Sequence, residues 1–480
     1  MDVEISKGAG LAADDDAEPP GLGLNSPSLH EYIDDDFWRR VPGYRHVSQR
    51  GFLDYQWQNQ NAVTRVDKLA ATLGDLLPEA FYRDVQDGLR RAPMSLRISP
   101  YIIALIDWRD PYGDPLRKQF LPLGSEQLPD HPLVGLDSLH EKHDEKVPGL
   151  VHRYQDKALF LALDLCPVYC RFCTRSYAVG IDTDGVSKYH LRAKPERWAM
   201  AFDYLRSQPQ IEDVVISGGD VHNLRADQIA DIGETLLEIP HIRRMRFATK
   251  AVGVQPTKFL TDDAWVEALV RVALRARQLG KEAALHTHIS HPNEITWITE
   301  QATRRLYTSG VTIRNQCVVL RGVNDDASTM KTLVKRLSYI NVQPYYVYQH
   351  DLVPGVEDLR TSLGTTLMLE KQVRGSTAGF NTPTFVLDAP GGGGKRDIHS
   401  FEHYDRVTGV SVYRSPNVDE NAVYIYFDPI ELLPEEGRMR WSDPNEHASI
   451  IGNAVLAAGQ DPSLLWGNNQ SAPRRRLPVM

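Results

Sequence analysis

The sequence lacks an excess of basic residues, lacks long apolar runs, and contains few cysteines. Among its 480 residues, 54 are Lys or Arg and 63 are Asp or Glu, so the formal net charge is −9. Residues 1–36 contain ten acids and one lysine, which accounts for all of this charge and leaves the rest of the chain neutral. A neutral body lacks the basic footprint that nucleic-acid binding requires, so we expect no nucleic-acid partner.

Membrane and secretory features are also missing from the sequence. No apolar stretch approaches the roughly 18–20 residues of a membrane span, and the longest candidate, 158–165, contains Asp164. The chain begins without the basic and then apolar segments of a secretory signal. Four cysteines are too few for a disulfide scaffold. These features predict a cytoplasmic protein with no membrane partner.

Short apolar segments alternate with amphipathic segments from Arg153 onward, as is typical of parallel β/α units. The predicted strands are 158–165, 213–217, 245–249, 283–289, 312–320 and 345–348, and the predicted helices are 195–206, 226–239, 262–279, 294–309 and 327–339. Six such units predict an α/β fold with a partial (β/α)6 TIM-like barrel. Functional residues of such folds gather at the C-terminal ends of the strands.

The composition changes along the chain and predicts five segments. They are a disordered acidic tail (1–36), an N-terminal helical region (37–148), the partial barrel (149–370), a C-terminal region (371–460) and a flexible tail (461–480). The C-terminal region contains a further predicted strand, 384–387, which leads to Gly391–Gly394 and Lys395. The pattern beyond this lysine is mixed and weak.

Three of the four cysteines, Cys166, Cys170 and Cys173, follow the first predicted strand with the spacing C-x3-C-x2-C. Three thiolates on one loop can bind three irons of a four-iron cluster and leave one iron open for a substrate or cofactor. Zinc is an alternative, but it usually needs a fourth ligand, and Cys317 lies far along the chain. The spacing therefore favours an iron–sulfur cluster and leaves Cys317 without a role.

The glycine run before Lys395 suggests a phosphate loop but departs from that pattern. No Ser or Thr follows the lysine, and the G-x4-G-K spacing is absent. A flexible linker is the plain alternative. A lysine on flexible backbone at a strand end could instead form a Schiff base with pyridoxal phosphate.

The cysteine loop, followed by Ser217-Gly218-Gly219-Asp220 at the end of the second strand, resembles the radical S-adenosylmethionine enzymes. In that family the open iron binds S-adenosylmethionine, and a Gly-Gly-acid segment holds its methionine amino group. The segment from Asp388 to Lys395 is similar to the pyridoxal-binding segment of the lysine 2,3-aminomutases. This second similarity runs from about Leu53 to beyond Lys395.

The resemblance implies an isomerase that moves the α-amino group of L-lysine to the β-carbon, through a pyridoxal aldimine on Lys395 and a 5′-deoxyadenosyl radical. It implies a [4Fe–4S] cluster, S-adenosyl-L-methionine and pyridoxal 5′-phosphate as cofactors. It also implies a reducing electron donor such as flavodoxin or ferredoxin, and a homo-oligomer. The alternatives are an arginine or other basic amino acid 2,3-aminomutase, a radical enzyme that modifies a protein-bound lysine, and a non-catalytic iron–sulfur protein.

The same resemblance assigns further residues to the site. The positions that match cofactor contacts are Arg153, Tyr154, Lys157, Tyr348 and Gln316. Arg175 matches the residue that grips the substrate carboxylate, and its planar fork suits that task. Asp351 and Asp388 match the carboxylates that bind the distal amine. Paired carboxylates repel each other without a cation between them, so this pair predicts a cationic substrate.

The sequence also contains a histidine group and some departures from the lysine enzymes. His286, His288 and His291 could bind a metal, but no carboxylate is placed to complete the site, so we expect them to line the cofactor cavity. Phe172 stands where the lysine enzymes have a histidine, and Ser176-Tyr177 replaces a more basic stretch. The C-terminal cysteines that bind zinc in some relatives are missing, so we predict no zinc.

Overall fold

The computed structural model describes residues 32–465. Its centre is one large sheet in which strands β1 to β10 follow each other in sequence order. The parallel strands are β3 (Lys157–Leu163), β4 (Asp213–Gly218), β5 (Arg244–Thr249), β6 (Glu282–His288), β7 (Thr312–Val318), β8 (Gln343–Tyr348) and β9 (Thr384–Ala389). The antiparallel strands at its edges are β1 (Glu145–Val147), β2 (Leu150–Val151) and β10 (Gly394–Asp397). The fold is therefore α/β with a large, mostly parallel sheet.

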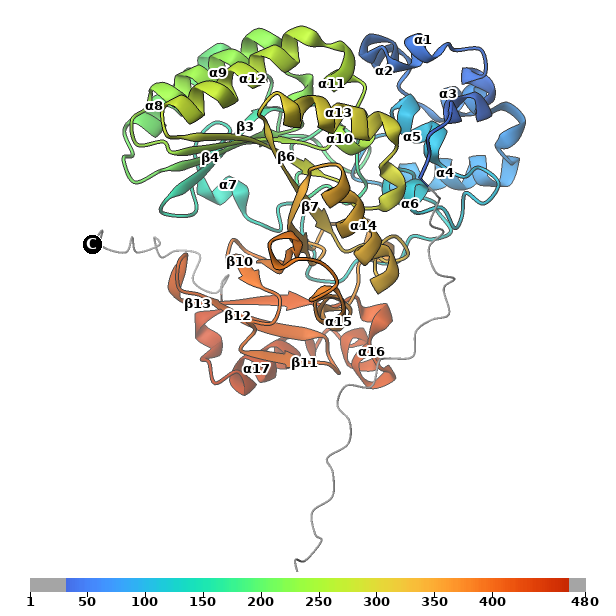
Figure 1. Ribbon diagram of the computed structural model, residues 1–480. Helices are drawn as coiled ribbons and strands as arrows, with labels where there is room; N and C mark the ends of the chain where they lie inside the picture. The colour runs from blue at the N-terminus through green and yellow to red at the C-terminus, as the bar shows by residue number, and fades with distance from the viewer. Residues whose placement is uncertain (1–31, 466–480) are drawn as a thin grey trace, which may run out of the picture.

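Helices connect the parallel strands, as the alternation of apolar and amphipathic segments predicts. They are α8 (Pro195–Arg206), α9 (Ala226–Glu238), α12 (Asp263–Gln278), α13 (Trp297–Thr308), α14 (Ala327–Tyr339) and α15 (Leu363–Val373). The short helices α10 (Ala251–Val254) and α11 (Lys258–Thr261) precede α12. In Figure 1, α8, α9 and α12 lie above the sheet, whereas α7 (Glu141–Asp144) lies on its other side, toward the C-terminal region.

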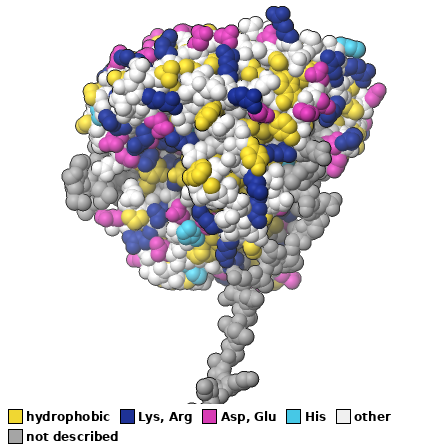
Figure 2. Space-filling model, in the orientation of Figure 1, with side chains coloured by type: hydrophobic (Ala, Val, Ile, Leu, Met, Phe, Trp, Pro, Cys, Tyr) yellow, Lys and Arg dark blue, Asp and Glu magenta, His cyan; other side chains and the backbone are white. Residues whose placement is uncertain are grey.

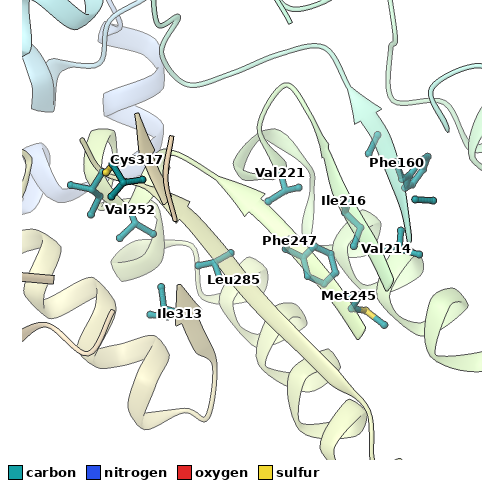
Figure 3. Packing of buried hydrophobic residues seen from close by; sticks show 14 of the residues in the cluster. Phe160, Val214, Ile216, Val221, Met245, Phe247, Val252, Leu285, Ile313 and Cys317 are labelled. Atoms are coloured by element: carbon teal, nitrogen blue, oxygen red, sulfur yellow. The ribbon is translucent and has the colours of Figure 1, made fainter. Parts of the chain in front are cut away.

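The core between the sheet and these helices is formed by large apolar side chains of neighbouring strands. Phe160, Ile216 and Phe247 on adjacent strands are fully buried and point into this layer (Figure 3). Cys317, left without a role by its sequence position, is 3% exposed and belongs to the same core. Burial raises the pKa of its thiol to about 12. It therefore serves as a small apolar core residue.

The N-terminal region is helical and has its own apolar core. Its helices are α1 (Gln49–Leu53), α2 (Tyr55–Asn61), α3 (Val66–Leu73), α4 (Glu79–Arg91), α5 (Pro100–Leu105) and α6 (Pro115–Phe120). Aromatic side chains dominate this core, and the rings of Trp38 and Phe52 stack with centroids 4.4 Å apart. Figure 1 shows these helices, in blue, beside the sheet.

The C-terminal region contains a second sheet that the sequence did not predict. It consists of β11 (His403–Asp405), β12 (Val410–Ser415) and β13 (Asp419–Phe427), with α16 (Glu435–Ser442) and α17 (His447–Ala457) beside it. Strand β12 is buried on both faces and includes two buried polar residues, Ser411 and Ser415, which interrupt its apolar pattern. Residues of this region belong to the same core as the main sheet.

The predicted bounds of the two tails include residues that are part of the folded structure. Ile33 pairs with Thr296, and the Trp297 indole donates to the Asp35 carbonyl at 3.0 Å, so the end of the predicted 1–36 tail is ordered against α13. The rest of that prediction, residues 1–31, lies outside the described residues. At the other end, Leu465 pairs with Val423, whereas residues 466–480 of the predicted flexible tail also lie outside them.

The sequence argued against nucleic-acid and membrane partners, and two features of the structure concern these arguments. On the face drawn in Figure 2, Lys and Arg side chains are interspersed with Asp and Glu side chains. Within residues 32–465, no helix is long and apolar enough to cross a membrane.

Candidate active site

The predicted site residues come together in one cavity. Its volume is about 930 Å³, and every residue assigned above to cofactor, metal or substrate lines it. They come from the residues flanking β3, from the ends of β4, β7 and β8, and from the hairpin of β9 and β10. Segments up to about 240 residues apart in the chain thus converge, as expected at the ends of parallel strands.

The three cysteines lie on the loop that follows β3. Burial raises the pKa of the Cys170 thiol to about 12 and raises those of Cys166 and Cys173 as well, and the mutual repulsion of the three thiolates adds to this in Cys166 and Cys170. Three thiolates can therefore coexist here only with positive charge close by, which iron would supply.

A single metal ion does not suit this loop. Among residues 32–465, no group of three or more Cys, His, Asp or Glu side chains is arranged to hold one ion. A four-iron cluster has a different requirement, because each cysteine binds a different iron atom. The donor set and its spread around a common cavity therefore fit a cluster.

The histidine group is only partly in the cavity. His286 and His288 line it, and burial lowers the pKa of His286 to about 3, so both rings are neutral near pH 7. His291 is fully buried elsewhere and caps a short helix by accepting from the Asn293 amide. The prediction that His291 lines the cavity is therefore wrong.

The Gly-Gly-Asp segment at the end of β4 is shaped by the cysteine loop. A Cβ on Gly219 would lie 2.3 Å from the Leu165 carbonyl oxygen, so only glycine allows this approach next to Cys166. Asp220 accepts from the amides of His222 (2.8 Å) and Lys250 (2.7 Å), and burial raises the pKa of its carboxyl. The segment is thus pressed against the loop that carries the thiols.

The glycine run is a tight turn and not a flexible linker. Strands β9 and β10 pair as a hairpin in which Lys395 lies opposite Asp388. Gly394 has φ of +77°, and a Cβ there would lie 2.4 Å from the Tyr154 hydroxyl. That hydroxyl accepts the Lys395 amide at 2.8 Å. The turn thus fixes the backbone of the lysine against the segment that precedes β3.

Lys395 and the two aspartates form one electrostatic group. The Lys395 Nζ donates to Asp388 Oδ2 at 2.9 Å and lies 5.5 Å from the centre of the Tyr348 ring. Burial alone would raise the pKa of Asp388, but Lys395 and Arg153 outweigh it and hold that pKa below its usual value. Burial and the charge of Asp388 raise the pKa of Asp351 well above its usual value. Two carboxyls whose pKa values move apart are typical of a functional site.

The same group retains unused hydrogen-bonding capacity. Asp388 Oδ1 is buried and accepts no hydrogen bond within the described residues. Burial lowers the pKa of Lys395, but Asp388 reverses this effect and raises it well above the usual value, so the lysine is an ammonium. The cation beside the acid pair is therefore supplied by the protein itself, with an acceptor left over for a second one.

The predicted cofactor contacts around Tyr154 are cationic and aromatic. The Arg153 Nε donates to Asp144 Oδ2 at 2.8 Å, and its Nη2 donates to the Leu139 carbonyl. The Lys157 ammonium lies 4.9 Å from the centre of the Tyr154 ring and 2.9 Å from Asp156 Oδ1. Elsewhere in the cavity, Gln316 accepts from the Tyr345 hydroxyl at 2.9 Å. These groups suit an anionic, aromatic ligand.

Arg175 has a carboxylate partner that the sequence did not reveal. Its Nη2 and Nε donate to Glu141 Oε1 and Oε2 at 2.8 and 3.0 Å, and the Tyr177 hydroxyl also donates to Oε2 at 2.8 Å. Glu141 begins the short helix α7 before β1, where no sequence signal distinguishes it from neighbouring acids.

Comparisons with known proteins match most of the chain, including the segment that carries Lys395. A family model described as Lysine-2,3-aminomutase matches residues 370–401, which include Asp388 and Lys395. The L-lysine 2,3-aminomutase of Clostridium subterminale is 38% identical over 402 residues, covering 82% of this chain and 89% of that protein. The L-lysine 2,3-aminomutase of Acetoanaerobium sticklandii is 37% identical over 357 residues, covering 74% and 80%.

A more distant similarity concerns a solved structure. A radical SAM methyltransferase from Sphaerobacter thermophilus aligns with 50% of this chain and 68% of its own at 15% identity, with a TM-score of 0.32, which is too low to support an argument. The sequence matches to the two aminomutases are much stronger evidence, because each match covers most of both chains, at 38% and 37% identity. On that ground the chain belongs to the lysine 2,3-aminomutase family.

Proposed function

We propose that the chain is an isomerase that moves the α-amino group of L-lysine to its β-carbon. The observation that carries this proposal is the cavity in which three thiols, a lysine, an arginine and two aspartates meet. The relatives that match most of the chain are named L-lysine 2,3-aminomutases. The acid pair supports a substrate with a cationic side chain.

The residues fit the three cofactors of the proposed reaction. Cys166, Cys170 and Cys173 would hold a [4Fe–4S] cluster, and the Ser217–Asp220 segment beside them would contact S-adenosyl-L-methionine. Arg153, Tyr154 and Lys157, with Gln316 and Tyr348 across the cavity, would hold pyridoxal 5′-phosphate, to which Lys395 would bind. The first two cofactors would supply a carbon radical, and the third would supply a conjugated ring that stabilises the unpaired electron while the nitrogen migrates.

The protein's own residues bind and orient the amino acid. Arg175 offers a planar guanidinium to the α-carboxylate, which fixes the end of the substrate that reacts. Asp351 and Asp388 take the distal ammonium at the other end. In the structure, the Lys395 ammonium stands in for that cation at 2.9 Å from Asp388. A substrate cation on the unused Asp388 Oδ1 would release Lys395 from this pair.

We also propose a barrel-like shape for the main sheet, an electron donor and an oligomeric state. The sheet would be an open, partial (β/α)6 barrel spanning residues 149–370, between a helical region (37–148) and a C-terminal region (371–460). The convergence of strand ends from β3 to β8 on one cavity supports this description. A reducing donor such as flavodoxin or ferredoxin would supply the electron, and the protein would act in the cytoplasm as a homo-oligomer.

An anaerobic reconstitution tests the proposed function. Enzyme loaded with iron, sulfide, pyridoxal phosphate and S-adenosylmethionine is reduced and offered lysine, arginine, ornithine or glutamate separately. Mass spectrometry and NMR should identify β-lysine from lysine. Product from arginine alone would replace the substrate within the same reaction class, and turnover of glutamate but not lysine would refute the role of Asp351 and Asp388.

A variant pair tests the lysine. Lys395→Ala should abolish the Schiff-base absorbance of bound pyridoxal phosphate, whereas Lys371→Ala on α15, away from the cavity, should keep it. Persistence of that band in Lys395→Ala would show that another group binds the cofactor.

A further inference from the structure

One short segment, Asp137–Glu145, contacts separate parts of the proposed site. Its Glu141 holds Arg175, and its Asp144 and Leu139 carbonyl hold Arg153. The carbonyl of Ser138 accepts the amide of Gly391, in the turn that leads to Lys395, at 2.8 Å. The segment therefore joins the predicted carboxylate, phosphate and Schiff-base positions.

Glu141 occupies one edge of the Arg175 guanidinium and leaves the other edge available. A guanidinium has two edges that can each bind a carboxylate with two parallel hydrogen bonds, Nε with Nη2 and Nη1 with Nη2. Glu141 takes the first edge. Within the described residues, Nη1 makes no hydrogen bond, and Arg175 lines the cavity with 22% of its side chain exposed. The second edge is thus the one a ligand can reach.

The segment is built to hold Glu141 in place. His140, the residue before Glu141, has φ of +52° and ψ of +42°, a left-handed conformation that non-glycine residues adopt rarely. The Asp137 carboxylate accepts from the amides of Glu141 (2.9 Å) and Lys142 (3.0 Å), which fixes the turn. Glu141 itself is 4% exposed, and both its carboxylate oxygens are used. Breaking so buried and saturated a pair is costly, so Glu141 does not compete with the substrate.

We infer that Glu141 is a positioning residue: by holding the Nε–Nη2 edge of Arg175, it presents the Nη1–Nη2 edge to the α-carboxylate of the amino acid substrate. This inference rests on the proposed function and adds to it the residue that orients the carboxylate-binding arginine. Glu141 would act on the substrate through Arg175. Its effect would therefore be confined to ligands that carry a carboxylate.

Binding without turnover tests this role. Reconstituted enzyme kept free of reductant is dialysed against labelled lysine or 1,5-diaminopentane, which is lysine without its carboxylate. Glu141→Gln should weaken lysine binding about 10-fold to 100-fold, because a charged hydrogen-bond pair is lost, and should leave diamine binding within about 2-fold. Tyr177→Phe, which removes one hydrogen bond to Glu141, should weaken lysine binding by about 3-fold.

A matched control removes a buried Arg–Glu pair elsewhere. Glu357 and Arg360, 3% and 0% exposed, pair at 2.6 Å outside the cavity, so Glu357→Gln should change neither affinity. Equal weakening of lysine and diamine in the Glu141 and Tyr177 variants would overturn the inference, and so would tighter lysine binding, which would make Glu141 a competitor for Arg175. These results are independent of turnover: wild-type enzyme that binds lysine but forms no β-lysine on reduction would refute the proposed function alone.

Discussion

Replacing Gly394 with alanine should destabilise the hairpin that carries Lys395, in two separable ways. The first is the backbone: φ at this position is +77°, where alanine costs about 1 kcal/mol relative to glycine. The second is a contact, because the new Cβ would lie 2.4 Å from the Tyr154 hydroxyl that accepts the Lys395 amide. Moving that hydroxyl loses a hydrogen bond worth about 1 kcal/mol. We therefore expect a total loss of about 2 kcal/mol.

Gly375 provides the control for the backbone effect. Its φ is +80°, but a Cβ there would meet no atom within 4 Å, so Gly375→Ala should lose only about 1 kcal/mol. Urea denaturation followed by circular dichroism gives both free energies of unfolding. The pyridoxal absorbance after reconstitution should fall in Gly394→Ala and persist in Gly375→Ala.

A double variant separates the contact from general damage. In Tyr154→Phe the hydrogen bond to the Lys395 amide is already absent, so adding Gly394→Ala should cost about 1 kcal/mol less than it does in the wild type. Equal losses for the two glycine variants, or strict additivity in the double variant, would refute the role given to the Tyr154 contact.

Three further changes test other parts of the structure. Burial raises the pKa of Asp428 to about 6, so between its ordinary value and pH 6 the folded state keeps a proton that the unfolded state has released. This group thus lowers the free energy of unfolding by about 3 kcal/mol as pH rises through that window. In urea denaturation, Asp428→Asn should therefore gain stability relative to wild type from pH 4 to pH 7. A difference in free energy of unfolding that stays constant over this range would contradict the pKa shift. Cys173→Ala should lower the iron content after reconstitution. Cys317→Ala should keep the iron and lose about 1 kcal/mol of stability, because Cys317 lies in the core. Equal loss of iron in the two variants would contradict their separate roles. Asp351→Asn should raise the KM for lysine about 10-fold or more, because a buried cation loses a charged partner, and an unchanged KM in steady-state assays would remove Asp351 from the substrate site.

The sequence predicted the elements whose signals are local. Strands β3 to β9 begin and end within two residues of most predicted bounds, because each is a short apolar run bounded by turn residues. The cysteine spacing and the Gly-Gly-Asp segment needed no tertiary information, since each motif lies within a few residues. The second sheet was missed because β12 buries two polar residues, Ser411 and Ser415, among its apolar ones, which weakens the pattern that reveals a strand.

The chain by itself determined which chemical groups are present and where strands end, because backbone conformation and side-chain alternation depend on neighbouring residues. Only the tertiary structure decided how these groups are paired. Arg175 and Glu141 are 34 residues apart, and the Tyr154 hydroxyl accepts an amide 241 residues away. Such pairs depend on the packing of segments that approach each other only after the sheet has formed, so no local pattern records them. Cys317 is a further example: the sequence shows that a thiol is present, but only its burial in the tertiary structure shows that it is a core residue.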